Sequence, residues 1–142
     1  MASDHQSVEP DWAALVEAMA DARRRKDEHA LMRLFDANAV LVDAAFERPR
    51  RGHGHIAETF RDLFQAAPDL RFEVAAGPLV SADGREAAVL WHGRGSVEVA
   101  EGQRATIRFQ TFELYRWGKR GISQACIFVR DLAQAVPVHR SA

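Results

Sequence analysis

The chain has 142 residues, a usual length for one compact domain, and 47% of them are hydrophobic. Nineteen basic and twenty acidic residues leave a net charge of −1, so the composition gives no sign of a nucleic-acid partner or of an anionic membrane surface. The single cysteine, Cys126, excludes an internal disulfide and a cysteine-rich zinc site. No stretch is apolar enough to span a bilayer, and the polar N-terminus has no signal core. We therefore expect a cytoplasmic protein.

The first part of the chain predicts a helix over residues 9–27. Trp12, Val16 and Met19 share one face of that helix, and Asp11 stands near its start. The basic run 23–26 falls at its end, where positive charge complements the helix dipole. We expect this run to be a solvated helix end rather than an interaction patch.

Two further helices and a strand follow. Residues 27–38 predict a short second helix, residues 39–45 have the composition of a strand, and residues 54–69 predict a third helix that Pro68 ends.

The rest of the chain predicts strands. Their ranges are 70–80, 86–99, 104–117 and 121–132. The connections between them are short and contain glycine, which predicts hairpin turns and a mostly antiparallel sheet. Helices followed by strands indicate one α+β domain over residues 9–132, with the helices on one face of a curved sheet. Residues 1–8 and 133–142 are expected to be flexible tails.

The strand predicted at 104–117 is apolar on both faces. Phe109 and Tyr115 lie at odd positions, whereas Phe112 and Leu114 lie at even ones. A half-solvated strand would alternate cleanly. We expect the outer face of the sheet to form a homodimer; a bulge near Thr111 that exchanges the two faces is the alternative.

The stretch AVLVDAAFERPRRGHGHIAETF at 39–60, followed by QAAPDLRFEV at 65–74, resembles the nuclear-transport-factor-2-like superfamily. Within it, the sequence is most similar to SnoaL-like polyketide cyclases and ketosteroid isomerases, over residues 9–132. The resemblance implies a cone-shaped fold, in which a bent sheet wrapped by helices closes over a deep apolar pocket, and it implies no cofactor. The superfamily carries many activities, so the fold alone does not decide the chemistry.

The resemblance assigns a catalytic role to Asp43. In the isomerases a strand-end aspartate, followed by a turn ending in Pro-Arg-x-Gly, is the base that moves a proton beside a carbonyl, and residues 49–52 match that turn here. A carboxylate aimed into an apolar pocket suits such a base. The structural alternative is a turn residue that faces solvent or pairs with Arg48, Arg50 or Arg51.

The isomerases hold the enolate oxygen with two hydrogen-bond donors, a tyrosine and a protonated aspartate. The resemblance implies that this chain has other residues at both positions. The helix tyrosine falls on Met19, which cannot donate a hydrogen bond, and the second donor falls on Gln110, whose amide can. The alternative for Gln110 is a hydrogen bond to a neighbouring group. The last-strand acid of SnoaL-like cyclases has no counterpart before Asp131.

Apolar residues are expected to line the pocket and to suit a flat hydrophobic ligand. The predicted lining comprises Trp12, Met19, Phe60, Trp91, Phe112, Ala125 and Ile127.

The remaining polar candidates have structural interpretations. His53 and His55 open the third helix without a Cys, Asp or Glu partner close in sequence, so a metal site is not expected and a polar helix start is favoured. Because neighbours on a strand face opposite ways, Trp91 faces the pocket and His92 the outer face; a reversed register would make His92 a candidate acid or base. Cys126 is interpreted as an inert residue.

Three functions remain open at this point. The first is an isomerase, cyclase or dehydratase that uses Asp43 and Gln110 for proton transfer on a hydrophobic carbonyl compound. The second is a ligand-binding or assembly module that has lost the chemistry. The third is the small subunit of a ring-hydroxylating dioxygenase, which would need a larger partner chain.

Overall fold

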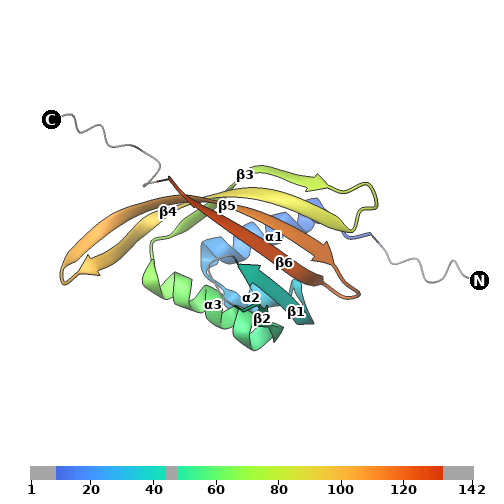
Figure 1. Cartoon of the computed structure of the whole chain (residues 1–142), viewed down its shortest axis with the longest axis horizontal. Helices are drawn as coiled ribbons and strands as arrows, with labels where there is room; N and C mark the ends of the chain where they lie inside the picture. The colour runs from blue at the N-terminus through green and yellow to red at the C-terminus, as the bar shows by residue number, and fades with distance from the viewer. Residues whose placement is uncertain (1–8, 44–47, 133–142) are drawn as a thin grey trace, which may run out of the picture.

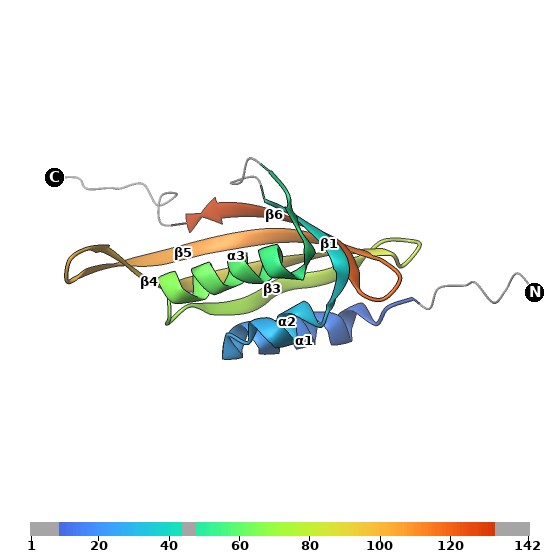
Figure 2. The same cartoon turned by 90° about the horizontal axis from the view of Figure 1, so that it is seen from below.

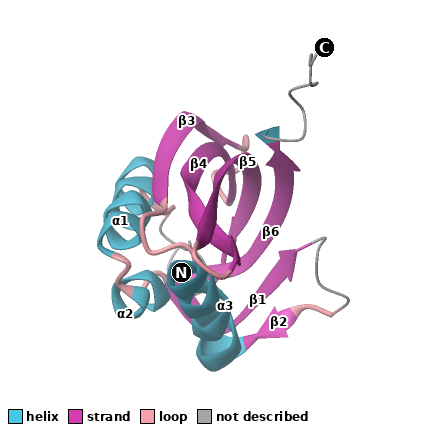
Figure 3. Ribbon diagram, turned by 90° about the vertical axis from the view of Figure 1, so that its left-hand side faces the viewer, coloured by secondary structure: helices cyan, strands magenta, loops and turns pink. Residues whose placement is uncertain are grey.

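The computed structural model describes residues 9–43 and 48–132. The predicted tails 1–8 and 133–142, and the end of the strand predicted at 39–45, lie outside the described residues. The fold is α+β, as predicted: three helices lie on the concave side of a curved six-stranded sheet (Figure 1 and Figure 3).

The elements follow one another with helices mostly before strands. They are α1 (Trp12–Arg25), α2 (Glu28–Met32), β1 (Phe35–Asp43), β2 (Arg50–Arg51), α3 (Gly52–Ala66), β3 (Arg71–Val80), β4 (Glu86–Ala100), β5 (Gln103–Trp117) and β6 (Ile122–Asp131).

Helix α1 begins and ends where the sequence indicates. The carboxylate of Asp11 accepts a hydrogen bond from the backbone N–H of Ala14, which satisfies one of the free donors of the first turn. Lys26 ends the helix in the left-handed conformation, with φ of 53°. The apolar face, with Trp12, Val16 and Met19 buried, packs toward the sheet.

The predicted second helix is shorter than expected, because Phe35 begins β1 instead of continuing the helix. Phe35 pairs with Ile122 of β6, whose N–H donates to the carbonyl of Leu34 at 2.9 Å. A side chain at Gly121 would come within 2.9 Å of the Phe35 backbone, so the glycine permits this close approach. Pairing with a distant strand therefore overrides the local helical pattern.

The sheet order is β2-β1-β6-β5-β4-β3, and only β1 and β6 run parallel among the described pairs. The β4–β5 register is continuous from Glu86 opposite Arg116 to Glu98 opposite Arg104. The alternative of a bulge near Thr111 is therefore wrong, and β5 keeps one inner and one outer face along its length.

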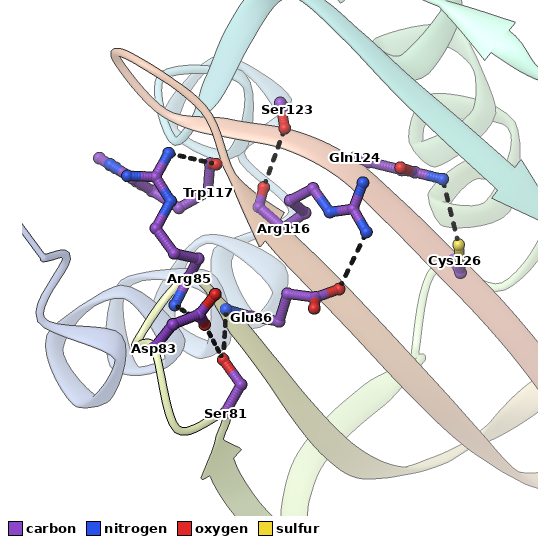
Figure 4. Close-up of polar contacts among 9 residues, drawn as sticks. All are labelled: Ser81, Asp83, Arg85, Glu86, Arg116, Trp117, Ser123, Gln124 and Cys126. Atoms are coloured by element: carbon purple, nitrogen blue, oxygen red, sulfur yellow. Dashed lines mark hydrogen bonds and ion pairs between the residues drawn. The ribbon is translucent and has the colours of Figure 1, made fainter. Parts of the chain in front are cut away.

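The β3–β4 connection is a hairpin turn, as its glycine indicates. Gly84 has φ of +75°, and the Asp83 carboxylate accepts from Ser81 Oγ at 2.7 Å and from the Arg85 N–H at 3.0 Å (Figure 4). Because these hydrogen bonds favour the charged form, the Arg85 N–H first and the Ser81 hydroxyl next, they lower the pKa of Asp83.

Figure 2 shows α3 running along the sheet beside the α1–α2 pair, so all three helices cover the same face. Gly52 opens α3 with φ of +83°, which confirms the predicted tight turn. In the part of the chain that the structure describes, no helix has the length and apolarity needed to cross a membrane.

Candidate functional site

A cavity of about 560 Å³ lies between α3 and the inner face of the sheet. Its lining combines aromatic and aliphatic side chains with several charged ones. The residues are Arg23, Asp43, Arg50, Glu58, Thr59, Phe60, Asp62, Leu63, Phe72, Ile107, Arg108, Phe109, Thr111, Glu113, Ile127, Val129 and Asp131.

Asp43 reaches this cavity because it ends β1 where that strand lies parallel to β6. Asp43 stands opposite Ile127 in the register, and Ile127 also lines the cavity. Arg50, from the short strand that pairs with β1, and Asp131, at the end of β6, belong to the same lining. The end of β1 thus places a carboxylate on the wall of an otherwise largely apolar space.

A buried ion pair forms another part of the wall. Arg23 of α1 and Glu113 of β5 are each only 2% exposed, and Arg23 Nη2 donates to Glu113 Oε1 at 2.7 Å while Nη1 donates to Oε2 at 3.1 Å. Thr111 Oγ1 donates to Oε2 at 2.7 Å and the Tyr115 hydroxyl donates to Oε1 at 2.5 Å. Glu113 therefore accepts four hydrogen bonds, two from the guanidinium and two from hydroxyls.

Aromatic rings surround the guanidinium of this pair. The Arg23 guanidinium carbon lies 4.2 Å from the Trp91 ring centroid, 4.9 Å from that of Phe72 and 5.6 Å from that of Phe60. Trp91 also extends the network, since its Nε1–H donates to the Tyr115 oxygen at 3.0 Å. The rings exclude water from the pair and attract its positive charge.

The network fixes the charges of its members. Burial alone would favour neutral Arg23 and neutral Glu113, but each charge stabilises the other, so the pKa of Arg23 is raised and that of Glu113 is lowered. Burial, together with the negative charge of Glu113, raises the pKa of Tyr115 well above its ordinary value. At neutral pH the site thus holds a guanidinium, a carboxylate and a neutral phenol.

The structure does not bring Gln110 to the cavity. Thr111 and Glu113 face inward, so Gln110 faces the outer side of the sheet, where its Nε2 lies 2.8 Å from Nε2 of His92. The prediction that Asp43 and Gln110 both face one cavity is therefore wrong. His92 is exposed on the outer face, as expected, whereas Trp91 is buried on the inner side of the sheet without lining the cavity.

The predicted lining residues separate into three groups. Phe60 and Ile127 line the cavity. The residues that are instead buried in the core and absent from the lining are Trp12, Met19, Trp91 and Ala125. Phe112 lies on the outer face of β5 and is 45% exposed, so its placement in the pocket is wrong. The reason is again strand parity: a residue one position from Thr111 must point the other way.

Sequence reasoning missed Arg23 and Glu113. Interpreting the run 23–26 as a solvated helix end is right for Arg24 and Arg25, which are 69% and 52% exposed, but wrong for Arg23. A signal was present, since Arg23 lies four residues after Met19, on the same apolar stripe of the helix. Glu113 likewise shares the parity of the inward-facing positions of β5.

The histidines at the start of α3 have structural roles or face solvent. His53 Nε2 donates to the carbonyl oxygen of Phe35 at 2.9 Å, and His55 is exposed. Across residues 9–43 and 48–132, no three His, Cys, Asp or Glu side chains gather as they would around a metal ion. Cys126 lies on the outer face, 3.6 Å from the Gln124 amide nitrogen (Figure 4).

Residues 16–121 match the model of the SnoaL-like domain. The chain belongs to this family. No curated protein matches the chain significantly.

Solved structures share the fold of this SnoaL-like chain at low sequence identity. SalBIII, an epoxide hydrolase/cyclase-like enzyme of pyran ring formation in the polyether salinomycin, is 19% identical with a TM-score of 0.68, over 84% of this chain and 93% of the other. A putative SnoaL-like polyketide cyclase from Shewanella denitrificans is 9% identical with a TM-score of 0.70, over 85% and 91%. A steroid delta-isomerase from Pseudomonas aeruginosa is 20% identical with a TM-score of 0.62, over 85% and 80%. These likenesses extend to the fold alone.

Proposed function

We propose that this SnoaL-like chain is a cofactor-free enzyme that transfers a proton beside the carbonyl group of a small hydrophobic molecule, with Asp43 as the base. The observation that carries the proposal is the position of Asp43 on the wall of the 560 Å³ cavity, at the end of β1. A cavity of this size is typical for a ligand of modest size, and the aromatic and aliphatic side chains of the lining favour an apolar one.

The chemistry that Asp43 can perform follows from the composition of the wall. A carboxylate accepts a proton from the carbon next to a carbonyl, and the same group returns it at another carbon in an isomerase or to a leaving group in a dehydratase. The reaction also needs a donor that stabilises the oxygen on which negative charge develops. Gln110 cannot supply it from the outer face of β5.

The proposal can be tested without knowing the natural substrate. We expect the protein to catalyse exchange of the α-protons of 1-tetralone or cyclohexanone for deuterium in D2O, followed by NMR. Asp43→Asn should slow the exchange by about 100-fold or more, because general-base catalysis commonly contributes that much. Gln110→Leu is the matched control, since this side chain lies outside the cavity. Equal exchange rates for wild type and Asp43→Asn would refute the role of Asp43.

A second candidate function is a binding module of the same fold. Met19 is fully buried in the core, where the isomerases are expected to carry a tyrosine donor, and Gln110 faces outward. Both observations favour a chain that has kept the cavity and lost the isomerase machinery. In that case the ketones bind equally well to wild type and to Asp43→Ala, and they are recovered without deuterium.

We also propose that two copies pair through the outer face of the sheet. One row of side chains across β4, β5 and β6 consists of Leu90, Phe112 and Phe128. Phe112 is 45% exposed and Phe128 is 55% exposed. The next row holds Leu114 and Cys126. An exposed apolar band of this kind is typical of an interaction surface.

A further inference from the structure

We infer that the Nε–H group of Arg23 is the hydrogen-bond donor for a neutral oxygen atom, a carbonyl or a hydroxyl, of the ligand in the cavity. The inference deepens the proposed function, on which it rests for the location of the substrate.

Arg23 has more hydrogen-bond donors than its ion pair with Glu113 uses. Its two terminal nitrogens donate to the two oxygens of Glu113 at 2.7 and 3.1 Å. Its Nε is buried and has no hydrogen-bond partner among the described residues. An unsatisfied buried donor is costly, and more so when the group is charged, so such atoms in a native protein call for an explanation.

Arg23 belongs to the cavity lining together with Thr111 and Glu113, and Phe60 and Phe72, whose rings lie near its guanidinium, belong to the same lining. Each terminal nitrogen gives an N–H to Glu113, so Nε is the nitrogen of this lining residue that has no hydrogen-bond partner among the described residues. An acceptor atom of a bound molecule would satisfy the orphaned N–H.

The Glu113 carboxylate restricts the charge that this acceptor can carry. Glu113, at 2% exposure, already balances Arg23, and both remain charged because each shifts the pKa of the other toward its charged form. A ligand carboxylate beside Nε would stand close to the Glu113 carboxylate and be repelled. A neutral oxygen has no such penalty, and it gains from the fixed N–H dipole when negative charge develops on it during proton removal.

Arg23 also lies on the buried face of α1. Met19 is one helical turn before Arg23 on the same buried face of α1. The hydroxyl of Thr111, which also belongs to the lining, already donates its hydrogen bond to Glu113. The donor role on α1 is thus assigned to Arg23.

The test compares ligands that differ by one oxygen. Binding of 1-tetralone and of tetralin, and of cyclohexanone and cyclohexane, is measured by NMR titration of the wild-type chain. We expect each ketone to bind at least about tenfold more tightly than its hydrocarbon, as for a hydrogen bond from a charged donor. Arg23→Lys keeps the charge facing Glu113 but has no Nε–H, so the preference should fall to about twofold or less. Arg24→Lys, on the exposed face, is the matched control.

A direct readout covers the case in which Arg23→Lys fails to fold. The Nε–H resonance of Arg23 in the wild-type protein should shift on addition of 1-tetralone and stay in place on addition of tetralin. Equal affinities within each pair, no binding of either ketone, or an unmoved Nε–H resonance would overturn the inference. Asp43→Asn should keep the ketone preference while losing deuterium exchange, so a failed exchange assay and a failed oxygen preference are distinguishable.

Discussion

Replacing Glu113 by glutamine removes one charge from the most buried ion pair of the described residues while changing the side-chain volume little. The wild-type carboxylate accepts four hydrogen bonds, two at each oxygen. In the glutamine variant one of these oxygens becomes an NH2 group, which cannot accept either of the two bonds made there. The guanidinium of Arg23, at 2% exposure, also loses its counter-charge.

The expected cost follows from these losses. Breaking a buried pair by removing one partner typically costs about 3–5 kcal/mol, because an uncompensated charge stays in the core. For a chain of this size, that corresponds to a fall in the melting temperature of roughly 10–15 °C. Urea unfolding followed by circular dichroism measures the change in the free energy of unfolding.

Two further variants make the result interpretable. Asp21→Asn removes the carboxylate from an exposed ion pair on the same helix, where Asp21 is 43% exposed, and should leave the urea midpoint almost unchanged. The double variant Arg23→Met/Glu113→Leu replaces the pair by apolar side chains and should be more stable than Glu113→Gln. A Glu113→Gln protein within about 1 kcal/mol of wild type would refute the buried network as described.

Three more predictions concern pH and the outer face of the sheet. Tyr115 is the only tyrosine of the chain, and its raised pKa means that stability from this group is present below pH 10 and lost as pH rises above it. The folded protein should therefore show no tyrosinate absorbance near 295 nm at about pH 11. In the urea-unfolded chain the tyrosine should titrate near its ordinary pKa of about 10. A folded protein whose tyrosine also titrates near pH 10 would contradict the hydrogen-bond network around Glu113. The pKa of Glu113 is lowered, so the stability that its charged form contributes is present above the ordinary carboxyl pKa of 4.5 and is lost as pH falls through the folded pKa. The difference in the free energy of unfolding between wild type and Glu113→Gln should therefore narrow below pH 4.5. A difference that does not change with pH would contradict the lowered pKa of Glu113. Phe128→Glu, at a side chain that is 55% exposed, should convert a dimer to a monomer in sedimentation analysis, and a wild-type protein that is already monomeric would refute pairing through the outer face.

Much of the fold could be predicted from local patterns. The apolar stripe of α1, the cap at Asp11 and the glycines of the hairpin turns each act over a few residues, and the structure confirms all three. The start of β1 at Phe35 could not be predicted in this way, because it depends on pairing with Ile122, 87 positions later in the chain. Local sequence there is compatible with a helix, and the distant strand decides.

The candidate site shows the same division. Asp43 could be placed at a strand end facing the interior, from the run of apolar residues before it and from the family resemblance; its catalytic role remains a prediction. The partner of Arg23 could not be found from sequence, since 90 positions separate it from Glu113. Charged residues on an apolar stripe are usually solvated at a helix end, and only the packing of α1 against the sheet shows that this one is not.

Gln110 illustrates how one position changes the chemistry. The family resemblance predicts Gln110 in the site, but the parity of the strand puts Thr111 and Glu113 inside and Gln110 outside. Alternation along β5 contradicts the predicted position of Gln110, because Tyr115 and Trp117 share the parity of Thr111 and Glu113.

The most direct test of the account is a crystal structure of the protein with 1-tetralone bound. We expect the ketone inside the 560 Å³ cavity, with its α-carbon about 3–3.5 Å from an oxygen of Asp43 and its carbonyl oxygen accepting a hydrogen bond from Arg23 Nε. A ketone bound in the cavity with its α-carbon remote from Asp43, or bound only elsewhere on the molecule, would contradict it.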